Sequence, residues 1–195
     1  IIENYEALKK ENILKNHKFI SDTDTEVAAA LINALYEETK DVYKALEAAS
    51  KKLIGSYAFG VIAHDDNKLY AMRKNAPLII GIGAGENFIA SDVPAILKYT
   101  KNYYTLDDGD IAVLTPNDVK VYRDGKLVNK EMLTFEYDIE TGMKNGYDHF
   151  MLKEIYEQPE VLDKTIHEYL KDGEFIGLPD LTKYNRIDIV ACGSA

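Results

Sequence analysis

The sequence lacks most of the features that define a specialised class of protein. It contains one cysteine, Cys192, in 195 residues, so no internal disulfide can form, which is typical of a reducing compartment such as the cytoplasm. No apolar run approaches the ~20 residues needed to span a bilayer, and the first residues show no basic, apolar leader. Basic residues are scarce, 23 against 33 acidic ones, and the net charge of −10 disfavours a general role in binding nucleic acid.

The remaining composition is that of an ordinary globular protein, with 46% hydrophobic and 29% charged residues. The length allows one large domain, or one domain and part of a second. The chain begins with Ile1 and ends in a buried-strand pattern followed by a turn of small residues, which normally leads into a helix. We therefore expect it to be a segment of a longer protein.

Apolar periodicity predicts helices first and strands afterwards. Helical spacing covers residues 4–16, 27–36 and 41–53. From Gly55 the pattern changes to short strands, at 56–63, 69–73, 77–83, 87–91, 103–106, 110–114, 119–123 and 126–127, with a short helix at 93–99. Asp107-Asp108-Gly109 and Asp124-Gly125 predict hairpin turns. So many strands with tight connections indicate antiparallel pairing, and hence an α+β fold.

A second part of the chain follows a glycine-containing connection at 141–148. A helical pattern at 149–170 contains Pro159, which predicts a kink or a division into two helices. Residues 171–185 are typical of a loop, and 186–195 predict a terminal strand and turn.

Two motifs of the first part suggest chemistry. Asp22, Asp24 and Glu26 could bind an amine or a metal ion at a helix start, but such side chains more often cap the helix, and the residues alone favour capping. The run Gly81–Glu86 lacks the third glycine of a dinucleotide-binding fingerprint and precedes a strand pattern. We interpret it as a loop between strands.

The other candidates have weaker patterns. Asp107–Asp110 lacks the distal glutamate of a calcium loop, and the four histidines form no metal-binding motif. Cys192 is a possible nucleophile, but a small buried hydrophobic residue is the favoured interpretation. Gly193 and Ser194 would expose backbone N–H groups suited to a phosphate if a helix follows them.

Several motifs, taken in order, resemble one family. Residues 21–26 (SDTDTE), 55–58 (GSYA) and 85–92 (GENFIASD) resemble the glutaminase domain of the glutamine:fructose-6-phosphate amidotransferases, the glucosamine-6-phosphate synthase family. Residues 146–151 (GYDHFM) with 153–159 (KEIYEQP) look like the segment that joins the glutaminase to the sugar-isomerase half of that family. Residues 191–194 (ACGS) resemble the first phosphate-loop strand of that half.

The resemblance implies an N-terminal-nucleophile hydrolase fold, an α/β/β/α sandwich of mostly antiparallel sheets that is incomplete in this chain. Residues 1–140 would be the later part of the glutaminase domain, 141–185 an inter-domain linker with helices, and 186–195 the first strand of an α/β sugar-isomerase domain. Without the preceding part of the domain, five apolar residues would face an incomplete core: Ile2, Phe59, Ile62, Ile79 and Ile89.

The family's activity takes ammonia from glutamine and delivers it to fructose 6-phosphate, without a cofactor or metal, giving glucosamine 6-phosphate. Its nucleophile is an N-terminal cysteine, and this chain has Ile1 there, so we expect no catalytic residue and no activity from the chain alone. Asp24 matches the aspartate that binds the α-amine of glutamine, in which case Ser21 or Asp22 caps the helix.

At the far end, Gly193 and Ser194 match the start of the family's sugar-phosphate loop. Ala195 departs from the family at a position where many members have serine, so one hydroxyl contact to the substrate would be missing.

The resemblance also implies partners. These are glutamine and fructose 6-phosphate, the preceding and sugar-isomerase parts of the same protein, and a second copy in a cytoplasmic homodimer; neither nucleic acid nor a membrane is expected. Two alternatives stay open. One is a non-catalytic glutaminase-like module with a binding or regulatory role, and the other is a related sugar-isomerase-linked amidotransferase or deglycase.

Overall fold

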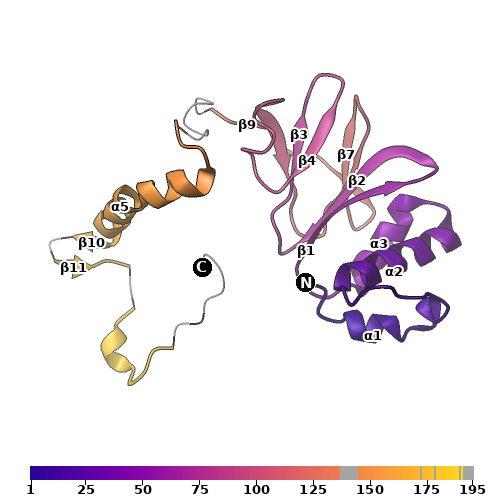
Figure 1. Ribbon diagram of the computed structural model, residues 1–195, viewed down its shortest axis with the longest axis horizontal. Helices are drawn as coiled ribbons and strands as arrows, with labels where there is room; N and C mark the ends of the chain where they lie inside the picture. Colours follow the sequence, from indigo (N-terminus) through magenta and orange to yellow (C-terminus); the bar gives the residue numbers. More distant parts are fainter. Residues whose placement is uncertain (137–144, 172, 178, 189, 191–195) are drawn as a thin grey trace. The chain divides into compact units, whose positions relative to one another are not determined.

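The computed structural model describes residues 1–136, 145–171, 173–177, 179–188 and 190. The chain divides into two compact units, Ile1–Ile139 and Glu140–Ala195 (Figure 1). None of the helices in these described ranges is long and apolar enough to cross a membrane.

Helices open the first unit, as the sequence predicts. They are α1 (Tyr5–Lys9), the 3₁₀-helix η1 (Asn12–Leu14), α2 (Asp24–Thr39) and α3 (Val42–Lys52). The two longer helices are confirmed. The predicted continuous helix over 4–16 is wrong, because Glu11 adopts an extended backbone that separates α1 from η1.

The strands form two antiparallel sheets. The larger has the order β1 (Tyr57–Ala63), β2 (Asp66–Lys74), β6 (Ile111–Leu114), β7 (Val119–Arg123) and β8 (Lys126–Val128). The smaller has the order β4 (Asn87–Ala90), β3 (Ile79–Ile82), β5 (Asn102–Thr105) and β9 (Leu133–Thr134). Strand β1 is an edge strand of the larger sheet.

The larger sheet lies between the helices and the smaller sheet (Figure 1). Side chains of β2 alternate between these two sides. Tyr70 and Met72 pack with the helices, whereas Leu69 and Ala71 pack with residues of the smaller sheet such as Ile80. This α/β/β arrangement of antiparallel sheets agrees with the predicted sandwich.

Of the five apolar residues expected to face an incomplete core, four are buried or partly buried within the first unit. Ile2 and Ile79 are buried, and Phe59 and Ile89 are partly buried. Only Ile62, on the edge strand β1, is largely exposed, at 79%.

Two local predictions in this unit are wrong. Residues 93–99 form successive turns rather than a helix, with Ile96 N–H donating to the Val93 carbonyl. Asp107-Asp108-Gly109 is not a hairpin turn, because β5 and β6 belong to different sheets. The Asp124-Gly125 hairpin between β7 and β8 is confirmed, with φ values of 49° and 75°.

The second unit contains helix α5 (Phe150–Tyr169), which runs through Pro159 without dividing. A hairpin of β10 (Leu170–Lys171) and β11 (Glu174–Phe175) and a 3₁₀-helix η2 (Leu181–Lys183) follow. The predicted terminal strand is not seen at Arg186–Asp188 or Val190. The remaining residues of that prediction lie outside the described part of the chain.

Candidate functional site

Asp24 is the first residue of α2, and its half-buried carboxylate contacts a segment far away in the sequence. Oδ2 accepts a hydrogen bond from the backbone N–H of Ile2 at 2.6 Å. This bond lowers the pKa of Asp24 below its usual value, so the side chain is ionised at neutral pH. The positive end of the helix dipole further favours an anion here.

The Ile1–Glu3 segment is held beside Asp24 by backbone pairing. Ile2 forms an antiparallel bridge with Gly55, flanked by hydrogen bonds from Ser56 N–H to the Ile1 carbonyl and from Glu3 N–H to the Ile54 carbonyl. The Ile2 N–H is therefore aimed by the pairing of its neighbours.

Gly55 makes this close approach possible. Its φ is +123°, and a Cβ there would lie 2.2 Å from the Ile1 carbonyl oxygen. Only glycine fits both constraints without moving the backbone.

The start of α2 is capped by Thr23, whose hydroxyl accepts from the Glu26 N–H at 3.3 Å. The prediction that Ser21 or Asp22 caps the helix is therefore wrong. Ser21 is instead engaged by Glu26, whose Oε2 accepts from the Ser21 N–H at 2.7 Å and from the Ser21 hydroxyl.

The sequence around Glu26 carries more information than its place in an acidic cluster suggests. Thr23-x-x-Glu26 is a capping-box sequence, in which the glutamate reaches back toward the preceding backbone. The other contact of the site, Ile2 N–H to Asp24, has no comparable local signal because 21 residues separate the partners.

Thr25, the next residue, also contacts the Asp24 carboxylate. Its hydroxyl lies 3.4 Å from Oδ1, longer than an ordinary O–H···O bond, and hydrogen bonds from its backbone and side chain add to the lowering of the Asp24 pKa. An ionised carboxylate oriented in this way is suited to accept a charge-assisted hydrogen bond from a ligand ammonium.

The sugar-phosphate candidates cannot be placed in the same way. Gly193 and Ser194, together with Cys192, lie outside the described residues.

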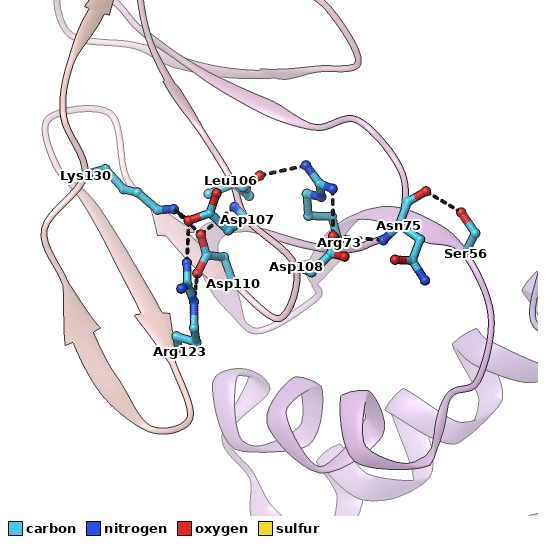
Figure 2. A network of polar contacts seen from close by, with 9 residues as sticks. All are labelled: Ser56, Arg73, Asn75, Leu106, Asp107, Asp108, Asp110, Arg123 and Lys130. Carbon is cyan, nitrogen blue, oxygen red and sulfur yellow. Dashed lines mark hydrogen bonds and ion pairs between the residues drawn. The ribbon is translucent and has the colours of Figure 1, made fainter. Parts of the chain in front are cut away.

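The second dense group of carboxylates, at the β5–β6 connection, is already occupied by protein cations (Figure 2). Asp110 is fully buried, accepts from Arg123 Nε at 2.8 Å and pairs with the ammonium of Lys130. Arg123 and Lys130 also contact Asp107 at 2.6 and 2.8 Å, and these contacts, that of Lys130 foremost, lower the pKa of Asp107. Within the described residues no group of metal-binding side chains is found.

A second branch of the same network reaches the Ile1–Glu3 segment. Asp108 accepts from the Asn75 N–H at 2.9 Å and from Arg73 Nη2 at 2.6 Å. The Asn75 carbonyl accepts from the Ser56 hydroxyl at 2.8 Å (Figure 2), and the Ser56 carbonyl accepts from Ile1 N at 2.5 Å. The network thus stabilises the pairing of Ile2 with Gly55, which positions the Ile2 N–H.

A cleft of about 520 Å³ lies between α2 and β1. Thr25, next to Asp24, is one of its lining residues, and the rest are mainly apolar, among them Ala28, Ile32 and Phe59. Its polar lining residues include Asn33, Glu37, His64 and Asp65.

The amino acids around Asp24 match a known family model. The model described as "Glutamine amidotransferase domain" matches residues 1–98, half of the chain. The chain belongs to the glutamine amidotransferase domain family.

Curated relatives extend this match over the full chain. A glutamine–fructose-6-phosphate aminotransferase (isomerizing) of Aquifex aeolicus is 46% identical over 197 positions, covering 100% of this chain and 33% of the relative. Proteins of the same name are 45% identical in Caldanaerobacter subterraneus, where the shares are 100% and 33%, and 42% identical in Thermococcus kodakarensis, with the same shares. The amidotransferase chain thus spans about one third of the length of these relatives.

A solved structure supports the fold. Glutamine phosphoribosylpyrophosphate amidotransferase from B. subtilis, complexed with ADP and GMP, is similar to this amidotransferase chain with a TM-score of 0.52 and 21% identity. The match covers 62% of this chain and 26% of that one. At this identity the likeness concerns the fold alone, and it agrees with the predicted N-terminal-nucleophile hydrolase sandwich.

Proposed function

We propose that this chain is the later part of the glutaminase domain of an enzyme that takes ammonia from glutamine and transfers it to fructose 6-phosphate, giving glucosamine 6-phosphate and glutamate. The names of relatives that are similar over the full chain support this activity. The observation that carries it is the Asp24 carboxylate, which a lowered pKa keeps ionised and which the Ile2 N–H orients through Oδ2.

In this proposal Asp24 binds the α-ammonium group of glutamine. A carboxylate suits an ammonium because a hydrogen bond between opposite charges is stronger than one between neutral groups. The anchor on Ile2 N–H fixes the orientation of the acceptor before glutamine arrives, which reduces the entropy lost on binding.

Asp24 alone performs no bond cleavage. Hydrolysis of the glutamine amide requires a nucleophile, and the one cysteine of the sequence, Cys192, is followed by Gly193 and Ser194, which we assign to the sugar-phosphate loop. The nucleophile would therefore come from polypeptide other than these 195 residues.

The division of the chain follows the same proposal. Residues 1–140 belong to the glutaminase domain, 141–185 to the linker, and 186–195 to the start of the sugar-isomerase domain. The intact protein would act in the cytoplasm as a homodimer.

The test uses the intact protein with glutamine and fructose 6-phosphate. We expect glutamate and glucosamine 6-phosphate in equal amounts, and synthesis with ammonia when glutamine is omitted. Binding of glutamine without turnover would instead favour a non-catalytic binding module. Release of glutamate without an amino sugar would point to a different acceptor.

A further inference from the structure

We propose that Glu26 is a positioning residue for the ligand ammonium site. It fixes the backbone that leads into α2, and thereby holds Asp24 where it meets both Ile2 N–H and the ligand. The inference rests on the proposed function of Asp24, and it adds a residue that does not itself touch the ligand.

Glu26 binds the segment before the helix with both of its oxygens. Oε1 accepts from the Ile20 N–H at 2.9 Å, and Oε2 accepts from the Ser21 N–H at 2.7 Å and from the Ser21 hydroxyl. These bonds, that of the Ser21 hydroxyl foremost, lower the pKa of Glu26 to about 2, which keeps the acceptor charged. Its side chain is only 18% exposed.

The residues between Ser21 and Glu26 close the turn from within. Thr23 N–H donates to the Ser21 hydroxyl oxygen at 3.3 Å, and the two hydroxyl groups lie 2.8 Å apart. Glu26 N–H donates to the Thr23 hydroxyl. Asp24, the first residue of α2, therefore follows directly on a turn that these hydrogen bonds fix.

This arrangement goes further than helix capping. In a capping box the glutamate satisfies the backbone N–H of the N-cap residue. Here the N–H of the N-cap, Thr23, is bonded to Ser21, and Glu26 reaches two and three residues further back. Its contacts thus act on the path of the chain toward Asp24, and not only on the end of the helix.

Loss of Glu26 would let Asp24 shift relative to Ile2. Because a displacement of ~1 Å in a positioning element costs up to ~100-fold in rate, we expect Glu26→Ala to raise the KM for glutamine by about tenfold. Synthesis with ammonia should be unchanged, since that route does not use Asp24. Glu26→Gln should have a smaller effect because its amide oxygen still accepts one set of bonds.

The experiment compares variants of the intact protein in both assays, with the thermal midpoint measured in parallel. Glu38→Gln, an exposed carboxylate near the other end of α2, is the control for charge. Asp41→Ala is the control for stability, because it removes the side chain that caps α3 and accepts from Lys44 N–H at 3.2 Å, far from Ser21 in the sequence.

An increase in the KM for glutamine with Glu26→Ala, not seen with Asp41→Ala, is the expected result. A KM equal to that of the unmodified protein, or equal losses with glutamine and with ammonia, would overturn the inference. If Glu26→Ala does not fold, the KM for glutamine is measured with Glu26→Gln and Ser21→Ala instead, and the same outcomes support or overturn the inference. Asp24→Asn is measured separately: if it leaves the KM for glutamine unchanged, the proposed function fails rather than the role of Glu26.

Discussion

Asp24 illustrates how a distant backbone group changes what a carboxylate at a helix start can do. Acidic residues in a first turn are common because they stabilise the helix dipole. The Ile2 N–H, held 2.6 Å away, turns this carboxylate into an oriented acceptor. Its position therefore depends on the pairing of Ile2 with Gly55 as much as on the helix.

The depressed pKa of Glu26 predicts a pH effect on stability. Folding lowers this pKa from an ordinary 4.5 to about 2, so the stabilisation is present above about pH 4.5 and is lost as the pH falls toward 2. The difference in thermal midpoint between the unmodified chain and Glu26→Gln should therefore shrink over this range. Thermal unfolding followed by circular dichroism at stepwise lower pH measures it, and a constant difference would contradict the assignment.

At the residue scale the ligand-binding role of Asp24 stays a prediction, whereas its place at the start of α2 is observed. The resemblance selects Asp24, whereas local patterns cannot distinguish a cap from a ligand-binding carboxylate. The capping prediction failed because Ser21, an ordinary capping residue, is engaged by Glu26. That competition depends on the path of the backbone, which composition does not reveal.

At the scale of elements, the contact between the Ile1–Glu3 segment and Gly55 connects the two ends of the helical part. Gly55→Ala should break it, because a Cβ would lie 2.2 Å from the Ile1 carbonyl oxygen. The matched control is Gly85→Ala, since Gly85 also has a positive φ, +77°, but has no atom within 4 Å of its added Cβ. Backbone strain of this kind costs about 1–3 kcal/mol. Urea denaturation should give Gly55→Ala the larger loss, and equal losses would show that the close approach is unimportant.

Replacing Asp110, the buried carboxylate at the β5–β6 connection, should also reduce the stability of the fold. Asp110→Asn removes the charge that faces Arg123 and Lys130, and breaking a buried ion pair costs about 3 kcal/mol or more. Asp118→Asn is the control, because its pair with Lys120 is exposed and contributes little. Calorimetry should separate the two variants clearly, whereas similar midpoints would mean that the network of Figure 2 does not stabilise the sheets.

The sequence predicts an element well where the spacing of its own apolar residues defines it. It predicts an element poorly where contacts with a distant segment define it. The two long helices and most strands follow from apolar spacing. The Asp107-Asp108-Gly109 motif signals a tight turn but not which sheet each flanking strand joins. The helix predicted at 93–99 is wrong. Its apolar residues Ile96 and Leu97 are buried, but by a run of turns, and apolar spacing alone does not distinguish turns from a helix.

At the scale of the whole molecule, the chain combines a layered amidotransferase unit with a second unit built around α5. The order of motifs along the sequence indicates both the family and its sandwich fold, because members of one family share one fold. The activity does not follow from composition, and it stays a proposal for a chain that spans about one third of its relatives.

The isolated chain should release no glutamate from glutamine. Its single cysteine, Cys192, stands beside Gly193 and Ser194, which we assign to the sugar-phosphate loop, so the proposed chemistry finds no cysteine nucleophile among these 195 residues. An enzyme-coupled glutamate assay with the purified chain measures this, with the intact protein as the positive control. Turnover above background would mean that the chain contains a nucleophile that the account does not recognise.

The central claim is that Asp24 binds the ammonium group of glutamine, and Asp24→Asn in the intact protein tests it most directly. The asparagine retains an oxygen for Ile2 N–H but loses the charge. Losing a hydrogen bond to a charged group costs about 1.5–3 kcal/mol, so the KM for glutamine should rise about 10- to 100-fold. Synthesis with free ammonia should stay unchanged. An equal loss of both activities, or an unchanged KM for glutamine, would contradict the account.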